Sequence, residues 1–142
     1  MRILITGGAG FIGSNLSQYL LSKNHEVIVV DYFSSGKLSN IDNLDTKLIK
    51  SKIQDLDNKK LSGTELIIHL AAQASVPLSM QDFYKSSSNN LLSSVKVFDI
   101  AKEFSAPVIY ASSASVYGNL AIGDDSCNEY ETLSPYALDI LT

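Results

Sequence analysis

Three glycines near the start of the chain have the spacing needed to hold a phosphate. Gly7, Gly10 and Gly13 follow the apolar run Ile3–Thr6 and precede an amphipathic stretch. The first glycine allows a sharp turn, the second lets a pyrophosphate approach the backbone, and the third lets a helix pack closely on the strand. The N-terminus of that helix favours an anion. The pattern predicts a dinucleotide-binding turn, and the alternative is a glycine-rich turn without a ligand.

An acidic residue follows at the distance that such a turn requires. Asp31 ends the buried strand expected over Glu26–Val30 and lies 18 residues after Gly13, close to the roughly 20 expected for a carboxylate that binds the adenosine ribose. A carboxylate repels a 2′-phosphate, and the next residues, Tyr32 and Phe33, supply no arginine to accept one. The sequence therefore favours NAD over NADP. The alternative is a polar loop residue at the end of a strand.

The elements that must position these residues alternate between strands and helices. The expected strands cover Ile3–Thr6, Glu26–Val30, Lys47–Ser51, Glu65–Leu70 and Pro107–Ala111, and the expected helices cover Phe11–Lys23, Leu38–Leu44, part of Ser75–Phe104 and a last stretch from Ser134–Pro135. This alternation predicts an α/β fold, a Rossmann-type doubly wound parallel sheet of order 3-2-1-4-5 in one domain over residues 1–142. The acidic stretch Gly123–Glu131 is expected to be a surface loop.

Such a sheet would gather the candidate residues at one edge. The turn from Gly7 to Gly13, Asp31, Ala71–Ala72 and Ser112–Ser113 all follow strands, and parallel strands end at the same edge. This convergence is the main reason to predict a binding site. Ala71 and Ala72 suit either a close ligand or a tightly packed helix, and His69 is expected to be packed or bonded to backbone rather than catalytic.

Composition and charge exclude other classes of function. The chain has 142 residues, of which 45% are hydrophobic and 18% charged, as expected for one globular domain. A net charge of −4 argues against a nucleic-acid or anionic-membrane surface. We expect no membrane span, no secretory signal and, by default, a cytoplasmic location. Cys127 is the only cysteine, and neither His25 nor His69 has a metal-ligand partner at motif spacing, so no metal site is expected.

Five motifs in order resemble the extended short-chain dehydrogenase/reductase family. They are Gly7-Gly8-Ala9-Gly10-Phe11-Ile12-Gly13 with Asp31, His69-Leu70-Ala71-Ala72, Ser112-Ser113-Ala114-Ser115-Val116-Tyr117-Gly118, and Ser134-Pro135-Tyr136. Within that family the chain looks most like the NAD-dependent nucleotide-sugar epimerases and dehydratases of the UDP-glucose 4-epimerase type. The resemblance covers essentially the whole chain.

The resemblance implies a role for each matching residue. The pyrophosphate would be bound by Gly7, Gly10, Phe11 and Ile12, the ribose by Asp31, and the adenosine end by Ser34, Ser35 and Gly36. Further contacts with NAD would come from Gly13, Ile53, Leu70, Ala71, Ala72, Asn89 and Ser112. Ser113 and Tyr136 occupy the catalytic serine and tyrosine positions. In such enzymes the tyrosine removes a proton from a hydroxyl of a nucleotide-sugar while NAD takes hydride from the same carbon, which gives a ketone intermediate.

Two side chains at the site depart from the family's pattern. Ile140 stands where the family has a lysine, four residues after the tyrosine. That lysine would lower the tyrosine pKa from its ordinary value near 10, and isoleucine cannot. Lys52 stands where an aspartate usually faces the adenine amine, and Tyr32 replaces a usual asparagine.

The length of the chain is the third departure, because it corresponds to about half of a family member. The sixth strand and the sugar-binding region would be missing, which would leave the fifth strand as an open edge. We expect a homo-oligomer that forms through this edge or through the segment Ser75–Phe104. Three readings remain open: the cofactor half of an epimerase or dehydratase that is inactive alone, a complete NAD-binding sensor or interaction module, and a remnant without function.

Overall fold

The structure is a computed structural model that describes residues 1–119 and 130–141. Most of the expected surface loop Gly123–Glu131, with Cys127, lies outside the described residues. The described residues form two compact units. The first contains Met1–Ala71 and Ser93–Ala111, and the second contains Ala72–Leu92 and the described residues from Ser112 onward.

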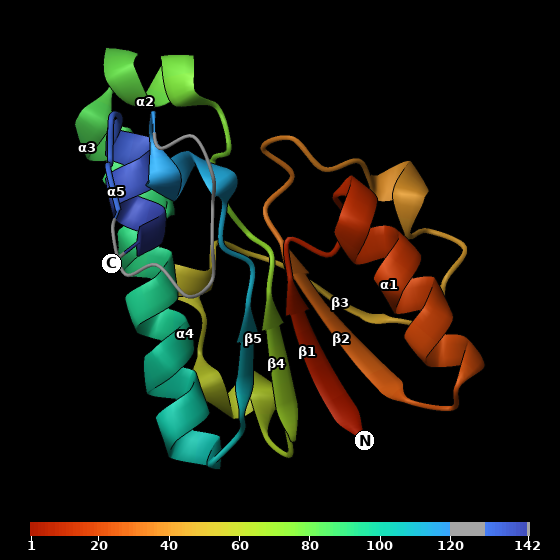
Figure 1. The fold of residues 1–142 in the computed structure, drawn as a ribbon. Coiled ribbons are helices and arrows are strands. Elements are labelled where there is room, and N and C mark those ends of the chain that lie inside the picture. Colours follow the sequence, from red (N-terminus) through yellow and green to blue (C-terminus); the bar gives the residue numbers. More distant parts are fainter. Residues whose placement is uncertain (120–129, 142) are drawn as a thin grey trace. The chain divides into compact units, whose positions relative to one another are not determined.

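The first unit is built on a five-stranded parallel sheet. Its strands are β1 (Arg2–Thr6), β2 (Glu26–Asp31), β3 (Lys47–Lys50), β4 (Leu66–His69) and β5 (Val108–Tyr110). Their order is β3-β2-β1-β4-β5, and every pairing is parallel, so the predicted topology is confirmed. The strand arrows all point toward one edge in Figure 1. Gly7 therefore leaves the sheet at the edge where β2 and β4 also end.

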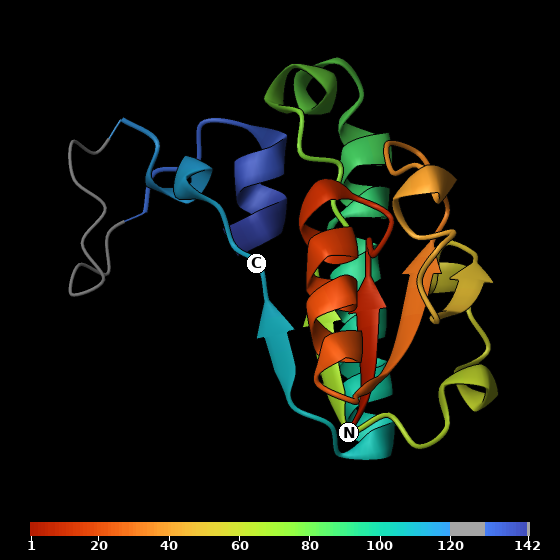
Figure 2. The ribbon, with the colours of Figure 1, turned by 90° about the vertical axis from the view of Figure 1, so that its right-hand side faces the viewer.

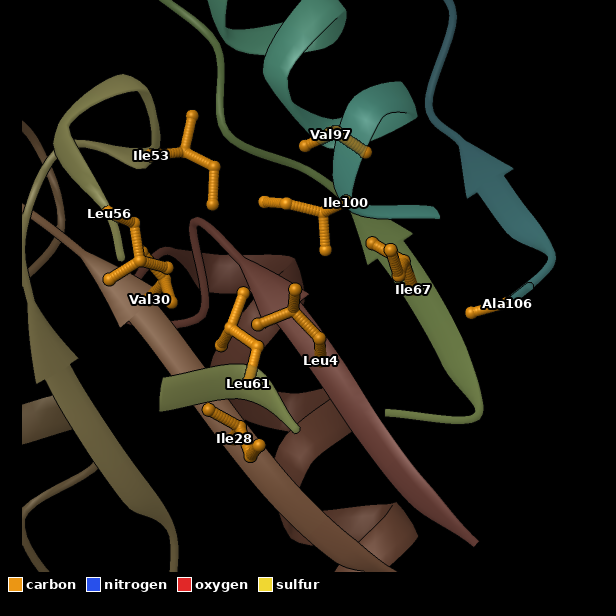
Figure 3. Packing of buried hydrophobic residues seen from close by; sticks show 10 residues of the cluster. All are labelled: Leu4, Ile28, Val30, Ile53, Leu56, Leu61, Ile67, Val97, Ile100 and Ala106. Atoms are coloured by element: carbon orange, nitrogen blue, oxygen red, sulfur yellow. The ribbon is translucent and has the colours of Figure 1, made fainter. Parts of the chain in front are cut away.

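Alternate residues along the central strands supply two separate cores, as the two-residue period of a strand requires. Leu4, Ile28 and Ile67 pack with Val97 and Ile100 of α4 (Leu91–Phe104) on one face, which is shown in Figure 3. On the other face, a cluster that includes Ile3, Ile5, Val27, Val29 and Ile68 packs against Leu16, Leu20 and Leu21 of α1 (Phe11–Ser22). Figures 1 and 2 show the two helices on opposite faces of the sheet. These cores fix where α1 begins relative to β1.

The segment Ser75–Phe104 divides into three helices. They are α2 (Val76–Gln81), α3 (Phe83–Asn89) and α4. The first break comes at Asp82, whose backbone is not helical and whose side chain accepts a hydrogen bond from the Lys85 N–H to cap α3. The short helix predicted over Leu38–Leu44 is only a 3-10 turn, η1 (Leu38–Asn40).

The remaining elements are short. Within the described part of the chain, three further 3-10 turns are η2 (Ile53–Asp55), η3 (Asn58–Leu61) and η4 (Ala114–Tyr117), and the last helix is α5 (Pro135–Leu141). The predicted cap of α5 is present, because Ser134 Oγ accepts a hydrogen bond from the Ala137 N–H at 3.1 Å. No helix among the described residues has the length and apolar character needed to cross a bilayer.

Candidate functional site

The glycine turn between β1 and α1 cannot accept side chains at two of its three predicted positions. Gly7 has φ +71°, and a Cβ there would lie 2.8 Å from the Ala71 backbone nitrogen. A Cβ on Gly13 would lie 2.5 Å from the Gly7 carbonyl oxygen. Gly10 differs, because a Cβ would meet only the Gly7 oxygen, at 3.2 Å. Packing therefore explains Gly7 and Gly13, whereas Gly10 leaves open space beside the backbone.

Helix α1 presents free N–H groups beside that open space. Gly10 is its N-cap, and the first hydrogen bond runs from the Ser14 N–H to the Gly10 carbonyl at 3.0 Å. The amides of Phe11, Ile12 and Gly13 precede this bond, and an α-helix offers such amides no partner within itself. The first turn contains no acidic side chain. Twelve residues of aligned peptide dipoles add partial positive charge at this end.

Asp31 ties the turn to the end of β2. Its carboxylate accepts one hydrogen bond from the Ala9 N–H at 3.0 Å and another from the Phe33 N–H at 2.7 Å. Asp31 is 9% exposed, and Ala9 is fully buried. A carboxylate has about four acceptor positions, so two remain for a ligand. The structure therefore brings the glycine turn and Asp31 together, as the sequence predicted.

The loop after Asp31 folds back on the glycine turn. The Ala9 carbonyl accepts hydrogen bonds from the Lys37 N–H at 3.1 Å and the Asn40 side-chain amide at 2.8 Å. A Cβ on Gly36 would lie 2.9 Å from the Ala9 carbonyl carbon, so Gly36 is required for this close approach. The candidates Ser34 and Ser35 are exposed beside it. The side chain of the candidate Ile53 lies in the core, which leaves its backbone for any ligand contact.

The end of β4 lies against the same turn. The Leu70 N–H donates to the Thr6 carbonyl at 3.1 Å, and the Ala71 N–H donates to Thr6 Oγ1 at 3.3 Å.

The sequence did not assign a separate role to Gly8, where an added Cβ would lie 2.6 Å from Val29 Cγ1. The doubled glycine at 7 and 8 was the available signal, and the second of the pair serves packing on β2.

His69 is buried and structural, and its partners are side chains rather than backbone. Nδ1 lies 2.5 Å from Thr6 Oγ1, and Nε2 lies 3.3 Å from Ser94 Oγ. His69 is 4% exposed, and this burial lowers its pKa to about 4. It contributes a neutral hydrogen-bonded link between β1, β4 and α4.

The lowered pKa of His69 predicts a loss of stability in mild acid. The unfolded chain takes up the proton near pH 6.5 and the folded chain near pH 4, so the contribution is complete above 6.5 and lost as pH falls toward 4. We expect urea unfolding to show a free energy about 2 kcal/mol lower at pH 5 than at pH 7. His69→Gln should remove this difference, and His25→Gln, at a histidine that is only partly buried, should keep it. An equal pH dependence in both variants would contradict the assignment.

The candidate catalytic residues belong to the second unit. Ser113 caps η4, and its Oγ accepts hydrogen bonds from the Ser115 N–H at 3.2 Å and Ser115 Oγ at 3.0 Å. Tyr136 is half-buried in the first turn of α5. Ala72 and Ser112 are exposed, and Asn89 is the partly buried last residue of α3. The catalytic roles of Ser113 and Tyr136 and the cofactor contacts of the other three residues stay predictions.

A buried polar cluster in the second unit was not predicted residue by residue. Asp139 is 2% exposed and accepts hydrogen bonds from Ser86 Oγ at 3.1 Å and Ser87 Oγ at 2.7 Å. Asn90 Oδ1 accepts from the Gln73 N–H at 2.7 Å. The run Ser86–Asn90 has low helix propensity, and these hydrogen bonds stabilise it. Ile140, at the expected lysine position, is 6% exposed.

Comparison with known proteins decides the family. Residues 3–139 match the model of the "NAD dependent epimerase/dehydratase family".

The chain belongs to the NAD-dependent epimerase/dehydratase family.

Individual relatives agree with this family assignment. UDP-glucuronic acid decarboxylase 1 of Xenopus tropicalis is 33% identical over 135 residues, which cover 94% of this chain and 32% of the relative. The UDP-N-acetylglucosamine 4-epimerase of Methanobrevibacter ruminantium, solved with UDP-N-acetylmuramic acid, has a TM-score of 0.89 and 33% identity over 99% of this chain. The UDP-glucose 4-epimerase of Thermus thermophilus, solved with NAD, has a TM-score of 0.86 and 29% identity over 99% of this chain. The chain spans 47% of each of these two structures.

The first unit fits the cofactor of the epimerase/dehydratase family. Gly10 leaves room at the backbone, α1 supplies N–H groups, and the Asp31 carboxylate retains acceptor positions. These are the groups that a pyrophosphate and a ribose require. The NAD expectation is confirmed at the level of the family, which is NAD dependent and includes a structure solved with NAD. Among the described residues, no group of three or more potential metal ligands occurs.

Proposed function

We propose that residues 1–142 form the NAD-binding part of a nucleotide-sugar epimerase or dehydratase of the UDP-glucose 4-epimerase type, with both units acting as one cofactor domain. The observation that carries the proposal is the bond from the Ala9 N–H to the Asp31 carboxylate. It joins the phosphate-binding turn to the ribose acid at one edge of the sheet. The matched family and the nucleotide-sugar relatives support the substrate class.

Each residue of the proposed site would have one role in binding NAD or in the reaction. The amides of Phe11, Ile12 and Gly13 bind the pyrophosphate, with Gly7 and Gly10 allowing its approach, and Asp31 accepts hydrogen bonds from the ribose hydroxyls. The adenosine end is lined by Ser34, Ser35 and Gly36. The remaining cofactor contacts come from Ile53, Leu70, Ala71, Ala72, Asn89 and Ser112. Bound NAD supplies reversible hydride acceptance. Ser113 donates a hydrogen bond to the sugar hydroxyl from which Tyr136 removes a proton.

Isothermal titration calorimetry with NAD tests this proposal directly. We expect one NAD site per chain and a lower affinity for free nicotinamide mononucleotide, which lacks the adenosine that Asp31 would bind. A thermal-shift series with NAD provides an independent readout, because a ligand that binds only the folded chain raises its melting temperature. No heat and no shift at millimolar NAD would contradict the proposal.

A second candidate is a non-catalytic NAD-binding sensor or interaction module. It is favoured by Ile140, because a buried isoleucine supplies no charge to promote ionisation of Tyr136. Tight NAD binding with a cooperative melt of residues 1–142 alone would favour this candidate. Weak NAD binding without turnover of UDP-glucose or UDP-galactose would instead favour the cofactor half of an enzyme, which we expect to be inactive alone.

We also propose that the chain forms a homo-oligomer and acts in the cytoplasm, without nucleic-acid or membrane partners. The support for an oligomer comes from exposed apolar side chains on two elements of the first unit. On α4, Val95 is 56% exposed and Phe98 51%, and Ile109 of the edge strand β5 is 55% exposed. An uncovered edge strand is a ready template for pairing with another chain. Light scattering across a concentration series measures the oligomeric state.

A further inference from the structure

The buried side chains of Thr6 and His69 form a link between two strands that the proposed function does not use. Thr6 is the last residue of β1, His69 is the last residue of β4, and the two pair across these strands. Thr6 is 0% exposed and His69 4% exposed. His69 Nδ1 lies 2.5 Å from Thr6 Oγ1. The link therefore lies at the edge of the sheet from which the glycine turn leaves.

The partners of the Thr6 hydroxyl decide which nitrogen of His69 carries the proton. Within residues 1–119 and 130–141, Thr6 Oγ1 has two hydrogen-bond partners, the Ala71 N–H at 3.3 Å and His69 Nδ1. The Ala71 N–H can only donate, so the Thr6 hydroxyl can give its own proton only to Nδ1. A buried donor without an acceptor costs free energy. Nδ1 is therefore unprotonated, and the neutral ring carries its proton on Nε2.

The other side of the ring agrees with this assignment. Nε2 lies 3.3 Å from Ser94 Oγ, and the Ser94 hydroxyl donates its proton to the Tyr110 hydroxyl at 3.4 Å. Ser94 Oγ can therefore only accept from the His69 ring. Burial lowers the pKa of His69 to about 4, so the ring is neutral at pH 7. The donors thus follow one direction, from the Ala71 N–H through Thr6, His69 and Ser94 to Tyr110.

The direction of the Thr6 hydroxyl matters to the glycine turn. A hydroxyl rotates about its C–O bond, and by accepting the proton His69 leaves a lone pair of Thr6 Oγ1 for the Ala71 N–H. The Ala71 backbone nitrogen is also the atom that a Cβ on Gly7 would meet at 2.8 Å. The end of β4 therefore packs directly on the first glycine of the turn, and Thr6 holds it there.

We propose that His69, as the Nε2–H tautomer, is a positioning residue for the cofactor, which acts through the Thr6 hydroxyl to hold the end of β4 against the glycine turn. This inference rests on the proposed function, which places NAD on that turn and beside Ala71. The two ring nitrogens then have separate roles. Nδ1 serves the cofactor turn, whereas Nε2 links the ring to α4 through Ser94.

Two substitutions of His69 separate these roles. His69→Asn places an amide oxygen near the position of Nδ1, where it can accept the Thr6 proton, and His69→Gln places an amide nitrogen near the position of Nε2, where it can donate to Ser94. In calorimetry at pH 7, we expect His69→Asn to bind NAD within about threefold of the unmodified chain and His69→Gln to bind about threefold to tenfold more weakly. Thr6→Val should also weaken NAD, and adding His69→Gln to it should weaken NAD little further.

NMR of the ¹⁵N-labelled imidazole tests the tautomer without any substitution. We expect the Nδ1 resonance of His69 at pH 7 to lie far downfield of the Nε2 resonance, as an unprotonated ring nitrogen does. Ile100→Val is the control for lowered stability, because Ile100 is 0% exposed in the core beneath α4. This variant should leave the NAD affinity unchanged.

The outcomes distinguish this inference from the proposed function. A proton on Nδ1, or equal NAD affinities of His69→Asn and His69→Gln, would overturn the inference and leave the proposed function standing. Failure of the unmodified chain to bind NAD would overturn both.

Discussion

Replacing Gly10 by alanine should greatly weaken NAD binding while leaving the fold intact. A Cβ at this position would meet only the Gly7 oxygen, at 3.2 Å, and the backbone has φ −75° and ψ 176°, which any residue adopts. The methyl group would fill the space through which the pyrophosphate reaches the α1 amides. Hydrogen bonds to charged groups are each worth about 1.5–3 kcal/mol, so we expect a loss of about tenfold to a hundredfold in affinity. Calorimetry measures the affinity, and urea unfolding should differ by less than about 1 kcal/mol.

Gly13→Ala provides the contrast, because it should damage the fold as well. The added Cβ would lie 2.5 Å from the Gly7 oxygen and 2.6 Å from the Gly8 Cα, and both are backbone atoms that cannot move independently. Overpacking of this kind costs about 1–3 kcal/mol, against a gain of about 1 kcal/mol from the higher helix propensity of alanine. We expect a net loss of stability and weaker binding.

The Gly10 prediction would be contradicted if Gly10→Ala bound NAD with the affinity of the unmodified chain. The phosphate would then not approach this part of the turn.

Replacing Asp31 by alanine should reduce both stability and NAD affinity. The Ala9 and Phe33 N–H groups would lose their acceptor, and an unsatisfied buried group costs about 1–3 kcal/mol. We therefore expect the free energy of unfolding to fall by about 3 kcal/mol. The ribose hydroxyls would lose their acceptor as well, so the NAD affinity should fall by about a hundredfold. Urea unfolding and calorimetry give the two numbers separately.

Two further variants sharpen the Asp31 experiment. Asp31→Asn keeps one acceptor oxygen and removes the charge, so both losses should be intermediate. Asp45→Ala removes an exposed acid and should change neither quantity. An Asp31→Ala chain with full NAD affinity would remove Asp31 from the cofactor site, even if its stability fell.

The sheet and the glycine turn could be predicted because local sequence and tertiary packing agree there. The runs Ile3–Thr6 and Glu26–Val30 are apolar, β-branched and bounded by polar residues or glycine, so their strand character does not depend on distant partners. Right-handed crossovers then leave few possible strand orders. The same reasoning placed Gly7, Gly13 and Asp31 close together, and the structure agrees.

Contacts between segments far apart in sequence could not be predicted. The break at Asp82 depends on a cap whose signal, an aspartate three residues before Lys85, is common on helix surfaces. Asp139 bonds to Ser86 and Ser87, more than fifty residues earlier, so no local pattern reveals its burial. Lys50 lies opposite Asp31 only through the pairing of β2 with β3. The sequence alone therefore predicted the edge of the sheet but not which side chains of neighbouring strands lie side by side there.

The most direct test of the central claim is a titration of the ¹⁵N-labelled chain with NAD, followed residue by residue by NMR. We predict the largest changes at the backbone amides of Gly10, Phe11, Ile12 and Gly13, with a second group at Ala9 and Phe33, whose N–H groups bind Asp31. Amides near Lys23, at the other end of α1, should not move. Unchanged amides at Gly10–Gly13 in the presence of millimolar NAD, or changes confined to other parts of the chain, would contradict the account.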